Sequence, residues 1–282
     1  MISHSFFRAA CTSLVVVALI AGTIGCGESE DSHEAGSVSR GQSGPVPDAN
    51  LRLAVRKALD KQAGIVRSYL DVDPETVSVT ASDMATLKGS FDARKGNLTD
   101  PIEDLTGLEL ATDLHILNLS GNNISDITPL AGLTELNYLA LSRNRIADIT
   151  PLAEMTWLRH LELSDNQIVD VSPLAGLTNI NYILNLSNNR IVDISPLPSV
   201  AGPANLYLSG NQIVDVTPLA RFTKLKNLQI NNNQIVDVSP LAGLTQLSRL
   251  NLTGNEGIED ASPLCDLKTT EIEGVEVECG GQ

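Results

Sequence analysis

The chain has 282 residues, the length of one or two domains, and carries 19 lysines and arginines against 34 aspartates and glutamates, a net charge of −15. This charge argues against a nucleic-acid-binding protein, because phosphate contacts need a basic face. Aromatic residues make up only 3% of the chain, so a core of Leu, Ile and Val is expected, and such a core indicates a repetitive fold. Four histidines and four cysteines leave little material for metal or nucleophile chemistry. We therefore expect no cofactor, no metal site and no catalytic residue.

Residues 1–25 are predicted to be a signal peptide. Arg8 supplies a weak positive charge, and the apolar run of 11 residues at Leu14–Ile24 is too short to span a bilayer. Cys26 follows Thr-Ile-Gly, which resembles the lipobox of bacterial lipoproteins, whose cysteine becomes lipidated. The sequence departs from that family at Thr23, where an aliphatic residue is preferred. An ordinary secretory signal that is cleaved nearby is the alternative.

Residues 26–46 are predicted to be the lipidated cysteine and a disordered linker, because they are rich in Gly, Ser and acidic residues without apolar periodicity. We expect an exported protein that only a lipid holds on a membrane of the bacterial cell envelope, with its domain displayed from that surface. In an oxidising compartment, Cys265 and Cys279 are expected to form a disulfide. Two free reactive thiols are the alternative.

From Leu114 onward the sequence repeats every 22 or 23 residues as L-x-x-L-x-L-S-x-N-x-I-x-D-I-S/T-P-L-A-G-L-T-x, and a degenerate copy around Ile102 precedes the regular ones. The L-x-L alternation predicts a strand with inward leucines, which stacked coils bury as a parallel sheet. The S/T-P pair predicts a short 3₁₀ or helical turn, with the hydroxyl at the N-cap and proline at N1. One asparagine per coil is expected to satisfy backbone groups of neighbouring turns. These are Asn122, Asn144, Asn166, Asn189, Asn211, Asn233 and Asn255.

This unit resembles the leucine-rich repeats of the internalin type over residues 98–268. The resemblance implies an α/β solenoid with a parallel sheet on its concave face and short 3₁₀ or helical turns behind. Internalin-like proteins are surface-displayed bacterial proteins that bind partners through that sheet. The resemblance therefore implies a non-catalytic, protein-binding domain.

Both ends of the repeats need caps, because an exposed leucine-rich end would aggregate. Residues 47–97 are predicted to form a helical cap, with one helix beginning at Pro47–Asn50 and a second at Thr80 with Asp83. The stretch Ile65–Val79 is interpreted as an insertion without an assigned role. Residues 269–282 are predicted to be a C-terminal cap in which Ile272, Val275 and Val277 form a last edge strand that the disulfide clamps.

The predicted ligand-binding residues point to the concave face from positions beside the strand leucines. Tyr138, His160 and Tyr182 are expected to stack as one column with Tyr207 beside them, and tyrosine is a preferred residue at binding hot spots. An extra residue near Ile183 allows a second register, which moves Tyr182 out of that column. That these are merely tolerated exposed residues is the alternative. The charged residues expected on the same face are Arg143, Arg159, Lys226 and Arg249 with Glu162 and Asp165.

Two further columns and one irregularity stand out. The aspartates either bind Ca²⁺ between coils or accept backbone N–H groups at their turns, and we favour the second interpretation. They are Asp126, Asp148, Asp170, Asp193, Asp215, Asp237 and Asp260. A valine precedes four of these aspartates. The valines either form an exposed apolar stripe that binds a partner, or they stiffen the extended backbone through their β-branched side chains. Pro198–Pro203 replaces the usual back turn and predicts a bulge or kink.

Enzymatic functions have little support. His115 and His160 lie two coils apart, about 10 Å at sheet spacing, too far for joint metal binding. We expect a monomeric domain that binds a protein partner and no nucleic acid. A scaffold that binds envelope glycan or cell wall, and a recognition subunit of an enzyme complex, are the alternatives.

Overall fold

The computed structural model describes residues 46–65, 74–97, 100–198, 202–267 and 271–279. The predicted signal peptide, Cys26 and the predicted linker up to residue 45 lie outside these residues. So does most of the predicted insertion.

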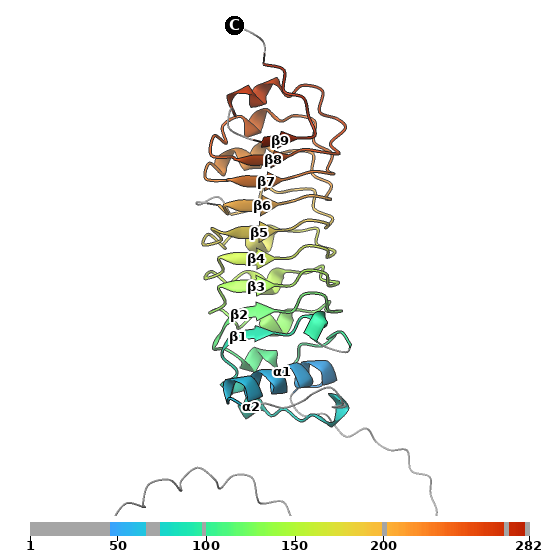
Figure 1. The fold of residues 1–282 in the computed structure, drawn as a ribbon, viewed down its shortest axis with the longest axis vertical. Coiled ribbons are helices and arrows are strands. Elements are labelled where there is room, and N and C mark those ends of the chain that lie inside the picture. The colour runs from blue at the N-terminus through green and yellow to red at the C-terminus, as the bar shows by residue number, and fades with distance from the viewer. Residues whose placement is uncertain (1–45, 66–73, 98–99, 199–201, 268–270, 280–282) are drawn as a thin grey trace, which may run out of the picture. The chain divides into compact units, whose positions relative to one another are not determined.

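One parallel sheet of nine strands runs through the described domain, and neighbouring strands follow in chain order (Figure 1). The predicted solenoid is confirmed. Each strand from β2 to β8 has a buried leucine as its second-last residue, and these leucines pair in register along the stack. The strands are β1 Gly89–Asp92, β2 Leu114–Asn118, β3 Tyr138–Ala140, β4 His160–Glu162, β5 Ile183–Asn185, β6 Asn205–Tyr207, β7 Asn227–Gln229, β8 Arg249–Asn251 and β9 Glu271–Glu273.

The chain returns to the sheet through short 3₁₀ turns that carry the S/T-P pair. The prediction placed the hydroxyl residue at the N-cap, which is wrong. Thr128 is the first residue of its turn, Pro129 the second, and Ile127 is the cap, without a side-chain hydrogen bond. The 3₁₀ turns of the described residues are Pro74–Thr76, Lys95–Asn97, Leu108–Leu110, Thr128–Leu130, Thr150–Leu152, Ser172–Leu174, Thr217–Arg221, Ser239–Leu241 and Ser262–Asp266.

A side-chain hydrogen bond at the start of each S/T-P turn comes from the aspartate column. In every coil the carboxylate accepts the backbone N–H two residues later, as Asp126 does from Thr128 at 2.8 Å. The same bond recurs at 2.7–2.8 Å in the other six coils. The side chain and the backbone N–H of Thr128 both donate to the Asp126 carboxylate and lower its pKa, because they stabilise the ionised form. The favoured interpretation of this column, acceptance of a backbone N–H at the turn, is confirmed.

The asparagine column ties each coil to the preceding one. Asn166 Nδ2 donates to the carbonyl oxygens of Leu141 and Leu163 at 3.0 Å, and its Oδ1 accepts the N–H of Ile146 at 3.0 Å. The other six asparagines repeat this arrangement, and all but Asn144 are classed as buried. Each amide thus satisfies backbone groups that would otherwise be buried without partners.

The N-terminal end is capped by two helices and a strand. Helix α1 spans Ala49–Gln62 with Asp48 as its N-cap, and α2 spans Ala81–Thr86, where Thr80 and Asp83 form a capping box. The two predicted helix starts therefore match the structure. The sequence interpretation missed β1, which follows α2 and pairs with β2. The cap thereby begins the sheet as well as covering it.

The C-terminal end is closed by β9 and a disulfide. Cys265 and Cys279 are bonded, with Cα atoms 5.5 Å apart. Strand β9 pairs in parallel with β8 and contains Ile272. Val275 and Val277 pack against the core after the strand has ended, so the edge strand is shorter than predicted.

The irregular coil between β5 and β6 is supported by the next coil. No 3₁₀ turn occurs in the described part of this coil, and residues 199–201, in the middle of the predicted bulge, lie outside the described residues. Arg221 Nη2 donates to the carbonyl oxygens of Ser195 and Leu197 at 2.9 and 2.5 Å. The ring of Phe222 packs so closely on Gly202 that a Cβ there would clash with it.

Candidate functional site

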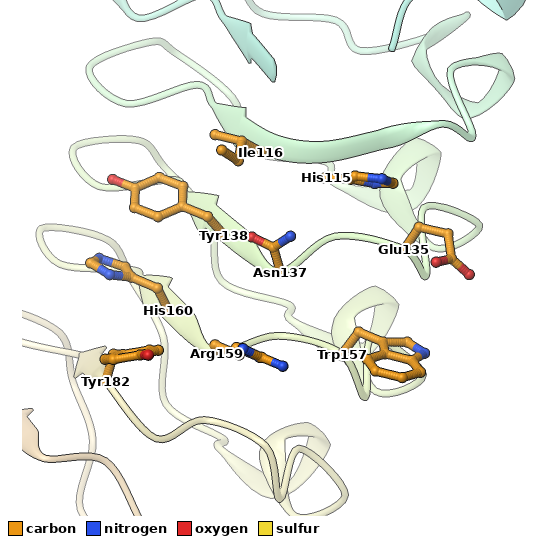
Figure 2. Close-up of a pocket in the computed structure, with 9 residues that line it drawn as sticks. All are labelled: His115, Ile116, Glu135, Asn137, Tyr138, Trp157, Arg159, His160 and Tyr182. Carbon is orange, nitrogen blue, oxygen red and sulfur yellow. The ribbon is translucent and has the colours of Figure 1, made fainter. Parts of the chain in front are cut away.

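Two hollows lie on the concave face, and the larger is lined by aromatic residues (Figure 2). We call the larger one, of about 580 Å³, the aromatic hollow. It spans β2, β3 and β4 and the segments just before β3, β4 and β5. Its lining residues are His115, Ile116, Glu135, Asn137, Tyr138, Trp157, Arg159, His160 and Tyr182.

The residues of the aromatic hollow form three rows along the stack. One row, Ile116, Tyr138 and His160, lies in the strands and is in register. The middle row is joined by backbone hydrogen bonds, from Asn137 N to His115 O and from Arg159 N to Asn137 O, both 2.9 Å. Figure 2 shows Glu135 and Trp157 as the third row, on the opposite side of the middle row from Tyr138 and His160. The hollow is therefore bounded by Tyr138 and His160 on one side and by Trp157 on the other.

The structure decides the register at Tyr182. Ile183, not Tyr182, pairs with His160, so the expected single column of Tyr138, His160 and Tyr182 is wrong and the alternative register is correct. The extra residue in this coil shifts the chain by one position before β5. Tyr182 N instead donates to Arg159 O at 3.2 Å, which places Tyr182 at the end of the middle row. It still lines the aromatic hollow.

Tyr138, His160 and Glu162 form a fixed cluster at one wall. The rings of Tyr138 and His160 have centroids 4.4 Å apart and are tilted by 35°. His160 Nε2 lies 2.6 Å from Glu162 Oε1, and since an ionised carboxylate only accepts, the imidazole donates. This bond lowers the pKa of Glu162, and burial raises the pKa of Tyr138. The cluster holds the two rings in place before any ligand arrives.

The rest of the hollow is exposed and unpaired. Trp157 and Tyr182 are 58% and 59% exposed, unusual for rings in a chain so poor in aromatics. Within the described part of the chain, the side chains of Asn137, Trp157 and Arg159 have no hydrogen-bond or ion-pair partner. These groups are available to a ligand.

The second hollow, of about 500 Å³, is polar. Tyr207 lies here, at β6, and so not beside Tyr138 and His160 as expected. Many of its groups pair with one another or with a neighbour. Arg249 Nε lies 3.5 Å from Glu271 Oε2, and Gln229 Nε2 donates to Asn227 Oδ1 at 2.8 Å. The lining residues of this polar hollow are Tyr207, Ser209, Asn227, Gln229, Arg249, Glu271 and Glu273.

The remaining predicted charges lie outside both hollows. Arg143 and Asp165 adopt φ values of 59° and 57° in the tight turns after β3 and β4, and Arg143 Nε lies 3.9 Å from Asp165 Oδ2. Lys226 precedes β7. The structure thus does not bring the four predicted cations together.

Sequence reasoning missed Glu135, Asn137 and Trp157 as members of the site, and it considered His115 only as a metal ligand. Trp157 and Glu135 each lie three residues before the first residue of a strand, where the repeat has no fixed residue type. The available signal was the one tryptophan of the chain, which stands three residues before His160.

The valine column points outward, and its members are about half exposed. It comprises Val169, Val192, Val214 and Val236. Both sequence interpretations, the partner stripe and the stiffened backbone, remain predictions. No group of three or more His, Cys, Asp and Glu that could hold a metal ion occurs among the residues that the structure describes.

Comparison with known proteins identifies the family. The family model described as leucine-rich repeats in two copies matches residues 112–154, 156–199, 204–243 and 223–266. The chain belongs to the leucine-rich repeat family, whose domains typically mediate protein interactions and are generally non-catalytic scaffolds. No curated protein matches the sequence.

Solved structures with this fold include internalins. Internalin C2 from Listeria monocytogenes is 33% identical, with 82% of this chain and 95% of that chain covered and a TM-score of 0.70. An internalin (inlF) from the same species is 29% identical, with 86% and 80% covered and a TM-score of 0.49. The ectodomain of the plant receptor kinase GASSHO1/SCHENGEN3 from Arabidopsis thaliana, solved in complex with CASPARIAN STRIP INTEGRITY FACTOR 2, is 21% identical, with 81% and 29% covered and a TM-score of 0.56.

No helix in the described part of the chain combines the length and the apolar character that crossing a bilayer requires.

Proposed function

We propose that this domain binds a protein partner through the concave sheet, with the aromatic hollow at the centre of the interface. The observation that carries the proposal is the gathering of exposed rings, Trp157 and Tyr182, around the stacked pair Tyr138 and His160. Large aromatic side chains bury much area at a low entropy cost, and they dominate binding energy at protein interfaces.

The domain organisation proposed with this function is that of a tethered receptor. Residues 1–25 are a signal peptide, Cys26 carries lipid, and residues 26–46 are the linker that separates a membrane surface of the cell envelope from the domain. Residues 47–97 and 269–282 cap the repeats of residues 98–268. The basis for this arrangement is the apolar run followed at once by a cysteine and a polar segment.

The test is a pull-down from envelope and surface extracts with the purified full chain, beside the double variant Tyr138→Ala/His160→Ala. We expect a protein that the parent retains and the variant loses, because the variant removes the fixed wall of the hollow. Arg249→Ala, in the polar hollow, is the matched control and should retain it. Circular dichroism must show that both variants are folded.

Two results would count against the proposal. Equal capture by the parent and the double variant would move the interface away from the aromatic hollow. A partner that Arg249→Ala loses and the double variant keeps would place the interface at the C-terminal half of the sheet.

A further inference from the structure

We propose that the aromatic hollow binds a proline-rich segment in the polyproline II conformation, supplied by the protein partner. This inference rests on the proposed function and gives the chemistry of the ligand. It is drawn from the balance of hydrogen-bond donors and acceptors in the hollow, from the arrangement of its rings, and from the repeat distance of the coils.

Three unpaired side chains of the hollow offer hydrogen-bond donors, and Glu135 is the one carboxylate among its lining residues. Asn137 offers an amide NH₂, Trp157 an indole N–H and Arg159 a guanidinium, and in the described residues no carboxylate or carbonyl oxygen engages them. A polyproline II segment has no internal hydrogen bonds, so its carbonyl oxygens are free to accept, and proline has no N–H that needs an acceptor. A helix or a sheet strand has already used most of its carbonyl oxygens.

The rings lie where proline rings need apolar faces. Tyr138 and His160 form one wall, and Trp157 lies on the opposite side of the middle row (Figure 2). Tyr182 follows Arg159 along that row through a backbone hydrogen bond. Proline-rich ligands dock in grooves between aromatic side chains, which cover the pyrrolidine rings while a donor bonds a carbonyl oxygen. The hollow combines both elements, and Ile116 is the one aliphatic side chain that lines it.

The repeat distance favours this conformation over an extended strand. Coils of a parallel sheet stack about 4.8 Å apart, so equivalent positions two coils apart, such as Ile116 and His160, are separated by about 9.6 Å. One turn of polyproline II takes three residues and advances about 9.3 Å. In a fully extended peptide, side chains on the same face recur at intervals of about 6.6 Å, which matches neither the spacing of one coil nor that of two coils.

The one tryptophan of the chain makes the test direct, because it lies in the hollow and its fluorescence reports on binding there. The purified full chain is titrated with decaproline and, separately, with a glycine-serine decamer of equal length. We expect decaproline to change the Trp157 emission saturably and the glycine-serine peptide to leave it unchanged. The same titration with tetragalacturonate tests a saccharide as the occupant.

Variants locate the response. Asn137→Ala removes a donor and Tyr182→Ala removes a ring, and each should weaken decaproline binding by about tenfold or more. Tyr207→Ala, in the polar hollow, is the matched aromatic control and should change the affinity by no more than about twofold, since most residues outside a hot spot contribute little. All three variants keep Trp157, so one readout serves every protein.

Three outcomes overturn the inference: no saturable response to decaproline, an equal response to the glycine-serine peptide, or a response to tetragalacturonate in place of decaproline. Equal weakening by Tyr182→Ala and Tyr207→Ala would also reject it. A captured partner that depends on Tyr138 and His160, together with no decaproline binding, would leave the proposed function standing and reject only this ligand.

Discussion

The aromatic hollow and the polar hollow are built on the same repeated framework but differ in how their side chains are occupied. Around β2–β4, the side chains of Asn137, Trp157 and Arg159 have no hydrogen-bond or ion-pair partner in the described part of the chain. Around β6–β9, Arg249 contacts Glu271, and Asn251 Nδ2 donates to Glu273 Oε2 at 2.7 Å. In the aromatic hollow these polar side chains are free to bond a ligand. In the polar hollow many polar side chains already bond one another.

This difference shows why the repeat framework alone says little about binding. A ligand in the polar hollow must first displace bonds that the protein already makes, so only the difference between old and new bonds stabilises the complex. A ligand in the aromatic hollow replaces water around exposed rings and unpaired donors. The variable positions, not the leucines or the ladder asparagines, therefore separate the two surfaces.

The largest expected effect comes from the disulfide at the polar end. Replacing both cysteines, Cys265→Ser with Cys279→Ser, should lower the free energy of unfolding by about 3 kcal/mol, because a closed loop of this size no longer restricts the unfolded chain. Urea denaturation measures the change. Hydrogen exchange should show the greater loss of protection in β7–β9, since each coil contacts only its neighbours. Equal loss in β2–β4 would mean that the two halves unfold as one unit.

The ladder asparagines should be equivalent in the two halves. Asn166→Ala and Asn233→Ala each leave buried backbone groups without partners and should each cost about 1–3 kcal/mol in urea denaturation. Gln212→Ala, on an exposed side chain, is the control and should change stability by less than about 0.5 kcal/mol. A clear difference between the two ladder variants would show that the framework itself differs between the hollows.

The smallest effect concerns the carboxylates of the two regions. Because the pKa of Glu162 is lowered in the folded state, its stabilisation is present above its unfolded pKa of about 4.3 and is lost as the pH falls through the lower folded pKa. Glu162→Gln should therefore reduce the thermal midpoint at pH 7, and its difference from the parent should vanish under acid conditions.

Glu271→Gln is the comparison in the polar hollow. Its partner Arg249 is half exposed, and exposed ion pairs contribute little, so the midpoint should barely change. If Glu271→Gln lowers the thermal midpoint more than Glu162→Gln does, the carboxylate of Glu162 does not stabilise the fold more than that of Glu271.

Much of the fold was predictable because the repeat imposes the same local rule many times. The alternation of leucines predicted the strands, and the asparagine column predicted the bonds between coils. Strand β1 escaped prediction because its sequence Gly-Ser-Phe-Asp lacks the L-x-L pattern, and pairing with β2 supplies what local propensity does not. The N-cap was assigned to the hydroxyl residue, whereas Ile127 is the cap of the first such turn and Asp126 accepts the N–H of Thr128. Ser, Thr and Asp all favour helix starts, and only the backbone path decides which of them bonds there.

The repeat was enough to predict the solenoid, its period and the residues that face inward, because leucine burial and the pairing of backbone groups favour the same arrangement in every coil. Which variable residues meet depends on how the coils stack. One extra residue before β5 moved Tyr182 from the wall to the end of the middle row, and stacking brought Trp157 opposite Tyr138 and His160. Side chains a whole coil apart in sequence become neighbours through register, which depends on every residue of the turn between them.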